Sequence, residues 1–197
     1  SDDLVYTTLF VLSRYCEELI KNPNSKEISD LFSELSTVSQ YYDAATKATS
    51  WRNYDNLFLL LGSTSYFLAE NFGSAKVLIR QIANWSYDEF IISVLYKTLY
   101  FLLLNKECSI SLHEENYIQY FNAVSNHFIQ GAPEKVIYNS LDILREQVYQ
   151  SQDVFGITYI DLLYGISICA IKHSAWILLP KYSEIDMELW KEYLLED

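Results

Sequence analysis

The sequence predicts an all-α fold, a multi-helix bundle of about nine helices joined by short turns. Apolar residues recur at three- and four-residue spacing along nearly all of the 197 residues, and no strand-like alternation persists for more than a few residues. Half of the residues are hydrophobic and 16% are aromatic, which can offset the entropy cost of ordering the chain. We therefore expect a single helical domain over residues 1–197.

The first two helices are indicated by two apolar faces separated by a polar break. Residues 4–20 follow the helical rhythm, "NPNSKE" interrupts it, and residues 28–38 resume it. Asn24 with Glu27 fits the capping box, in which each side chain bonds the other's exposed amide. The second helix is therefore predicted to begin near Asn24.

A helical hairpin is predicted next, from helices over about 51–70 and 73–84 with a turn at Gly73. Gly62 and Gly165 each lie inside a predicted helix, where glycine costs up to about 1 kcal/mol relative to alanine. Close approach of a neighbouring helix would compensate for this cost, so we expect tight packing at both positions.

The hairpin resembles one tetratricopeptide unit, with Ala75 at the small position and Tyr66 and Phe72 at aromatic positions. The pattern does not recur 34 residues later, and Glu70 occupies the position of the turn glycine. We therefore expect a single tetratricopeptide-like hairpin and no repeat array. Ala75 would let the second helix approach the first, while Tyr66 and Phe72 would wedge the turn.

Two more helix starts are predicted from capping boxes, Ser86 with Glu89 and Ser111 with Glu114. The apolar run "FIISVLYKTLYFLLL" follows the first box and reads as a helix over 90–104. The run is too short to span a membrane, so it is predicted to lie in a soluble core.

In the last third of the chain, Gly131 is predicted to end one helix and Pro133 to begin the next. A helix over 134–150 follows, then a long apolar helix over 156–179 and a short acidic helix near 185–195. The long run contains the charged residues Asp161 and Lys172, and His173 beside them, which are costly within a bilayer. It is therefore predicted to be a core helix rather than a membrane span.

The charge and the cysteine content limit which binding partners and which cellular compartment are expected. The net charge is −12 and no two basic residues are adjacent, so neither nucleic acid nor an anionic membrane is expected to bind. Lys76 and Arg80 lie one turn apart and are interpreted as a solvated helix face. The three cysteines are sparse and widely spaced, which favours buried thiols and a reducing, cytoplasmic location. They are Cys16, Cys108 and Cys169.

Motifs for catalysis, cofactors and metals are not found in the sequence. None of the glycines stands in a phosphate-loop frame, and no "ExxH" pair suggests a di-iron bundle. The three cysteines and His113, His127 and His173 do not form the clusters of three or four ligands that zinc requires, and "LHEEN" is interpreted as an acidic helix start. No catalytic, cofactor-binding or metal-binding residue is therefore predicted, and the chain is not expected to be an enzyme.

Two stretches together resemble a known family. "FLLLGSTSYFLAENFGSAKVLIRQI" (58–82) and "SAWILLPKYSEIDMELWKEYL" (174–194) are similar to the helical region before the motor of bacterial DEAD/DEAH-box helicases of superfamily two. Several of these helicases act in defence against phage. The similar stretches cover about a quarter of the chain, and Tyr66 and Phe67 replace the family's usual small residues. The family's phosphate loop, DEAH box and arginine finger would lie beyond residue 197, so ATP and Mg are implied only for a motor there.

Three hypotheses follow for the function. The first is a non-catalytic accessory domain of an ATP-dependent helicase, cut from the N-terminal part of a larger protein, because the chain begins with serine rather than methionine. Its partner would be a protein, either its own motor or another subunit. The second is a free-standing helical scaffold of the tetratricopeptide-like adaptor kind. The third is an unrecognised all-α enzyme, such as a lipid or isoprenoid transferase, with a buried pocket.

Overall fold

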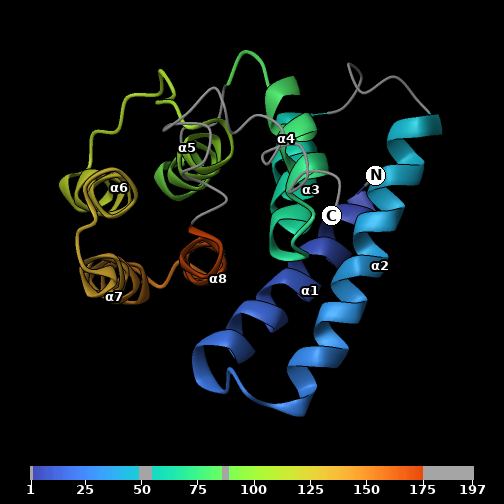
Figure 1. Ribbon diagram of the computed structural model, residues 1–197, viewed down its shortest axis with the longest axis horizontal. Helices are drawn as coiled ribbons and strands as arrows, with labels where there is room; N and C mark the ends of the chain where they lie inside the picture. The colour runs from blue at the N-terminus through green and yellow to red at the C-terminus, as the bar shows by residue number, and fades with distance from the viewer. Residues whose placement is uncertain (1, 49–54, 86–88, 175–197) are drawn as a thin grey trace. The chain divides into compact units, whose positions relative to one another are not determined.

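The computed structural model describes residues 2–48, 55–85 and 89–174, and within them the chain forms eight helices and no strand (Figure 1). The predicted all-α class is confirmed. The acidic helix expected near 185–195 lies outside the described residues, so the count of about nine stays a prediction. The chain divides into two compact units, residues 1–86 and 87–196. A single domain over residues 1–197 also stays a prediction.

The first unit is built from two helical hairpins. Its helices are α1 (Asp2–Lys21), α2 (Lys26–Ala48), α3 (Asn56–Leu68) and α4 (Phe72–Gln81). The helices α1 and α2 pack along each other, α3 packs against both, and α4 packs on α3. Leu12 and Leu35 are fully buried between the first two helices, as the apolar faces predict. The core therefore lies where the helices face one another.

The ends of the second hairpin differ from the prediction. Asp55 caps α3 by accepting a hydrogen bond from the Leu57 amide at 2.8 Å, and residues 49–54 lie outside the described part. The predicted turn at Gly73 is wrong, because Gly73 lies within α4. Glu70 makes the turn instead, with a φ of 63°, and Asn71 caps α4 by accepting from the Ser74 amide at 3.1 Å. Asn71 moves the start of α4 ahead of the glycine, because its side chain satisfies an exposed amide.

Packing inside this hairpin explains two of its small residues. A Cβ on Gly62 would stand 2.8 Å from Leu78 Cδ1 and 2.9 Å from Tyr42 Cδ1, so the predicted close approach at Gly62 is confirmed. Ala75 is fully buried, and its carbonyl accepts a hydrogen bond from Ser63 Oγ at 2.8 Å. Any larger side chain at either position would separate the helices.

Two aromatic residues of the hairpin are buried on either side of the turn. Phe72 packs edge-to-face on Phe67, with ring centroids 5.2 Å apart. Tyr66 is buried, and its hydroxyl donates to Asp43 on α2 at 3.2 Å. That Tyr66 and Phe72 wedge the turn stays a prediction.

The second unit is a four-helix arrangement. Its helices are α5 (Phe90–Leu104), α6 (Glu115–Gln130), α7 (Glu134–Gln150) and α8 (Val154–Lys172). Each helix packs against two others, in the order α5, α6, α7, α8 and back to α5, which Figure 1 shows nearly end-on. The bounds of α5 and α7 agree with the predicted 90–104 and 134–150. Gly131 ends α6 with a φ of 72° and Pro133 precedes α7, as predicted.

Both predicted capping boxes of this unit fail in the described residues. Glu89 and Glu114 hold the N-cap positions of α5 and α6 themselves, without a side-chain capping bond, instead of lying one turn inside. Ser86 lies outside the described residues. Before α6, the Lys97 ammonium donates to the Ile110 carbonyl at 3.3 Å and ties this segment to α5.

The helix α8 is long and apolar enough to cross a membrane by length and composition, but it packs as a core helix of the second unit. About two thirds of its apolar window is buried there. Its one carboxylate, Asp161, is ion-paired with Arg145 of α7 at 2.7 Å. The helix ends at Lys172, and the predicted continuation to 179 falls largely outside the described residues.

Candidate functional site

The histidines singled out in the sequence hold structural positions. The His113 ring lies beside Phe90, with centroids 6.4 Å apart, and His127 Nδ1 contacts the Ala132 carbonyl at 2.6 Å. His173 is the C-cap of α8. Among the described residues, no group of three histidines, cysteines or carboxylates is placed to hold a metal ion.

The cysteines and the basic pair follow their predictions only in part. Cys16 and Cys169 are buried as expected, but Cys108 is half-buried in the loop after α5. Arg80 is exposed, whereas Lys76 is half-buried, so a fully solvated basic face is wrong for Lys76. Burial, followed by the charge of Arg80, lowers the pKa of Lys76 to about 8.

A polar hollow of about 250 Å³ lies in the first unit between α2 and the α3–α4 turn. Asp43 and Tyr66 line it together with Asn71. Asp43 already accepts from Tyr66 and pairs with Lys47 at 3.2 Å, and Asn71 already caps α4. The polar groups of this hollow are thus engaged in holding the fold, which leaves little for a ligand.

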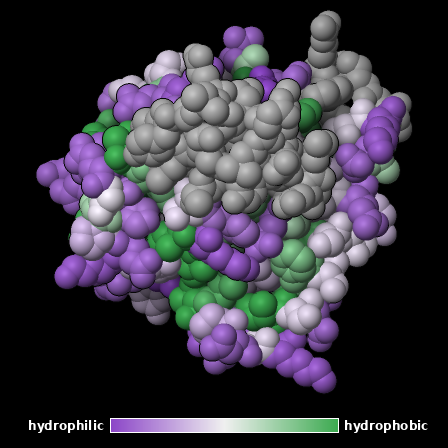
Figure 2. Space-filling view, in the orientation of Figure 1, coloured by the Kyte–Doolittle hydropathy of each residue, from purple (hydrophilic) through white to green (hydrophobic). Residues whose placement is uncertain are grey.

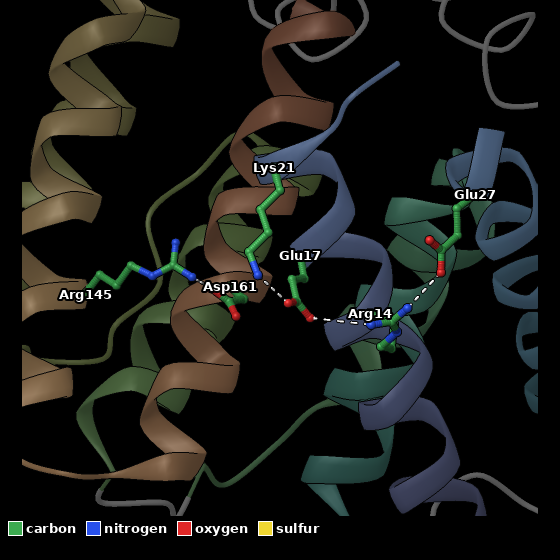
Figure 3. A network of polar contacts seen from close by, with 6 residues as sticks. All are labelled: Arg14, Glu17, Lys21, Glu27, Arg145 and Asp161. Atoms are coloured by element: carbon green, nitrogen blue, oxygen red, sulfur yellow. Dashed lines mark hydrogen bonds and ion pairs between the residues drawn. The ribbon is translucent and has the colours of Figure 1, made fainter. Parts of the chain in front are cut away.

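Exposed ion pairs on α1 form the other conspicuous polar feature of the first unit. Arg14 contacts Glu27 at 2.7 Å and Glu17 at 3.9 Å, and Lys21 contacts Glu17 at 2.6 Å (Figure 3). Their side chains are exposed by 36% or more. Such solvated pairs contribute little to stability, and we assign them to the helix surface.

A groove runs along α7 to the start of α8. Two open hollows of about 380 and 480 Å³ adjoin there and share Glu146 and Tyr149. We call them together the α7–α8 groove. It is lined by Asp142, Arg145, Glu146, Tyr149, Gln150, Gln152, Val154 and Ile157.

Apolar side chains stand out in solvent at one end of the groove. Tyr149, Val154 and Phe155 are 69%, 73% and 69% exposed, and Phe155 follows Val154 in the chain. On the face that Figure 2 draws, hydrophobic residues gather in patches between hydrophilic ones. Tyr6 and Phe10 on α1 are similarly exposed, at 67% each. The α7–α8 groove combines exposed apolar area with a concave surface, a combination that is typical of interaction sites.

The turn between α7 and α8 explains why these side chains point outward. Gln152 adopts a φ of 59°, and its amide donates to the Tyr149 carbonyl at 3.1 Å. Asp153 then caps α8, because its Oδ1 accepts from the Gly156 amide at 2.9 Å. The tight turn fixes the last residues of α7 against the first residues of α8, so the exposed apolar residues are held on a rigid support.

An aromatic and charged network forms the other end of the groove. The Arg145 guanidinium pairs with Asp161 at 2.7 Å, which Figure 3 shows, and lies 5.5 Å from the Tyr164 ring centroid. The Tyr164 hydroxyl donates to Asp142, and the Tyr138 ring stacks on that of Tyr164. Burial, and then the Asp142 hydrogen bond, raises the pKa of Tyr164. The network fixes the groove wall.

The electrostatic balance of the groove is negative. Asp142 and Glu146 line it, and Asp153 stands at its turn. Among the described residues that line the groove, Arg145 is the one cation, and Asp161 compensates for its charge.

Sequence reasoning missed this groove. "YQSQDVF" (149–155) places apolar residues on both sides of a polar turn, which is the one signal it gives. The same pattern fits buried helix ends, and only the packing of α7 on α8 separates the two cases. No protein-family model, no curated protein and no solved structure matches this chain. The groove is therefore interpreted from its own residues.

Proposed function

We propose that this chain is a non-catalytic protein-interaction domain whose contact surface is the α7–α8 groove. The observation that carries the proposal is the exposure of Tyr149, Val154 and Phe155, at 69%, 73% and 69%. Large apolar side chains grouped in solvent beside a hollow are favourable to bury against a partner. Tyrosine in particular is enriched among residues that dominate binding energy at protein interfaces.

We further propose that the domain is the accessory region of an ATP-dependent DEAD/DEAH-box nucleic-acid helicase, whose motor lies C-terminal to this chain. The similarity of residues 58–82 and 174–194 to that region supports this proposal. On this proposal the motor holds the ATP and Mg, and the bound protein is the motor or a partner subunit of a bacterial defence system. The natural reading frame is then expected to continue past Asp197 into a phosphate-loop motif. A frame that ends there would contradict the helicase assignment.

The alternative is a free-standing helical scaffold of the tetratricopeptide-like adaptor kind. The α3–α4 hairpin supports it, because Ala75 and Phe72, at the small and aromatic positions of such a hairpin, are both buried. The same groove would serve as the contact surface in this case. For both versions we propose a cytoplasmic location, which the sparse cysteines support.

The interaction proposal is tested by substitution in the groove. The tagged protein and its Phe155→Ser variant are expressed in the native cells, crosslinked, and compared by quantitative mass spectrometry. Val77→Ser on α4, which is 45% exposed, serves as a control of the same kind. We expect a defined set of proteins to be lost with Phe155→Ser and retained with Val77→Ser. Equal recovery with all three proteins would contradict the groove as the contact surface.

A further inference from the structure

We propose that the partner presented to the α7–α8 groove is a basic amphipathic helix, with apolar residues on one face and Lys or Arg beside them. This inference rests on the proposed interaction function and adds the chemical class of the partner. Two features of the groove carry it, namely the sign of its charge and the position of its apolar residues.

The charge argument begins with the carboxylates. Asp142 and Glu146 are one turn apart on α7 and both line the groove, while Asp153 stands at the turn before α8. Asp142 and Asp153 accept hydrogen bonds from Tyr164 and from the Gly156 amide, so these two are held in place. Arg145 is engaged by Asp161 at 2.7 Å and is not available to balance them. A partner that brings Lys or Arg to this edge therefore gains attraction from Asp142 and Glu146, while the charge of Arg145 is already compensated by Asp161.

The apolar argument concerns where a partner side chain would be buried. Tyr149 belongs to both hollows, and Val154 and Ile157 line the second one with it. The apolar residues lie at the α8 end, and the carboxylates Asp142 and Glu146 continue along α7. A helix that places an apolar stripe on Tyr149 and Val154 would carry its flanking polar residues past the carboxylates. Helix-in-groove binding of this kind uses apolar anchors at three- and four-residue spacing.

Other occupants fit less well. A second copy of this chain would bring its own net charge of −12 and the same carboxylates to the groove, so like charges would oppose the contact. Nucleic acid and anionic lipid surfaces are repelled for the same reason. A basic protein helix satisfies both the apolar and the charged part of the surface.

The test measures peptide binding to the full chain by fluorescence anisotropy. Three synthetic peptides of about 18 residues share one leucine face and carry Lys, Gln or Glu at the remaining positions. Binding is compared for the wild-type protein and for Tyr149→Ala and Glu146→Lys. The matched controls are Tyr41→Ala, at a tyrosine 60% exposed on α2, and Glu107→Lys, at an exposed carboxylate outside the groove. Circular dichroism verifies that each variant is folded.

We expect the Leu/Lys peptide to bind about tenfold more tightly than the Leu/Gln peptide, and the Leu/Glu peptide more weakly still. Tyr149→Ala should weaken Leu/Lys binding by about tenfold, because it removes an anchor. Glu146→Lys should reduce the preference for Leu/Lys over Leu/Gln. Both controls should bind as the wild type does, and the preference should fall with added salt.

The outcomes separate the two proposals. If Leu/Gln binds as tightly as Leu/Lys and Tyr149→Ala weakens both, the groove is an interaction surface and the basic partner is wrong. If Tyr149→Ala binds every peptide as the wild type does, or the wild type binds none, the groove as the contact surface is wrong as well. Equal losses with Glu107→Lys and Glu146→Lys would assign binding to net charge and overturn the inference. A dimer that Tyr149→Ala abolishes in sedimentation velocity would make a second copy the occupant and also overturn it.

Discussion

At the scale of single residues, Arg145 and Asp161 show how an apolar core helix carries a charge. Asp161 lies in the middle of α8 with its side chain 12% exposed, and Arg145 on α7 is 33% exposed. A carboxylate taken out of water is costly unless a partner charge and hydrogen bonds compensate for it. The 2.7 Å contact between the two side chains therefore does more than join α7 to α8. It makes the burial of α8 possible.

Arg145→Leu is expected to lower the free energy of unfolding by about 2 kcal/mol, because Asp161 loses its ion-pair partner in a poorly hydrated position. The comparison is Lys47→Ala, which removes the Lys47–Asp43 pair with side chains 77% and 50% exposed. That loss should stay below about 1 kcal/mol, since exposed pairs are weak. Urea denaturation measures both. Equal losses would mean that the burial of Asp161 does not set the energy of its pair.

A second residue-scale prediction concerns Glu70, which makes the α3–α4 turn with a φ of 63°. A residue with a Cβ is strained in this region and glycine is not, so Glu70→Gly is expected to raise the free energy of unfolding by about 0.5–1 kcal/mol. Asn84→Gly, at a φ of 53°, should gain less, because asparagine tolerates this conformation better. Thermal and urea unfolding compare the two. A less stable Glu70→Gly protein would contradict the backbone argument.

At the scale of helices, helix bounds were predicted most accurately where the apolar periodicity agrees with residues that end or begin helices. The bounds of α5 and α7 were predictable because each has a continuous pattern, and Gly131 and Pro133 mark the junction before α7. Helix starts were harder, because a capping box is a local preference that a tertiary contact can override. At α6, Glu114 holds the N-cap position that the sequence predicted for Ser111.

The candidate site was not predictable in the same way. Its lining residues come from two helices and the turn between them, and they have no spacing that a motif search would recognise. Tyr149 and Val154 are ordinary apolar residues in the sequence, and their exposure depends on how α7 packs on α8. The negative charge of the chain was visible from composition, but its concentration beside exposed apolar residues was not.

The contact between α3 and its neighbours gives a prediction at the helix scale. Because alanine has a higher helix propensity than glycine, Gly62→Ala alone would stabilise α3 by up to about 1 kcal/mol. Its new Cβ would stand 2.8 Å from Leu78 Cδ1 on α4 and 2.9 Å from the ring of Tyr42 on α2, which is fully buried. Overpacking of this kind costs typically about 1–3 kcal/mol, so we expect a net loss of about 1 kcal/mol.

The Gly62 prediction is checked with a double-mutant cycle. Leu78→Ala makes space for the new methyl, so the loss for the Gly62→Ala, Leu78→Ala double variant should be smaller than the sum of the single losses. Gly131→Ala is the comparison, since no atom lies within 4 Å of its added Cβ and its φ of 72° alone strains it. That variant should show no coupling to Leu78→Ala. Additive losses at Gly62 and Leu78 would mean that the clash is relieved elsewhere.

At the scale of the whole molecule, the chain builds its cores with many tyrosines. There are 17 among the 197 residues, and several are buried in each unit. Burial raises the pKa of Tyr42, Tyr120 and Tyr159 to about 12 from an ordinary value of 10.0, and it is the largest cause in each case. The Tyr120 hydroxyl lies 3.2 Å from Ser167 Oγ, and this hydrogen bond offsets part of the rise in its pKa. Both units therefore contain phenols that must stay protonated in the folded state.

This burial predicts unfolding at alkaline pH. Each folded-state pKa lies above the unfolded value of 10.0, so the contribution is fully present below pH 10 and is lost as pH rises toward 12. Each such tyrosine lowers the free energy of unfolding by up to about 1.4 kcal/mol per pH unit in that window. Lys76 has the opposite effect, because its pKa is lowered from 10.5 to about 8, so that it raises the free energy of unfolding as pH rises from 8 to 10.5.

Urea titrations above pH 10.5 isolate the effect of the tyrosines, with tyrosinate absorbance as a second signal. Tyr42→Phe should flatten the decline and the exposed Tyr41→Phe should not, and a decline unchanged by Tyr42→Phe would contradict the burial argument.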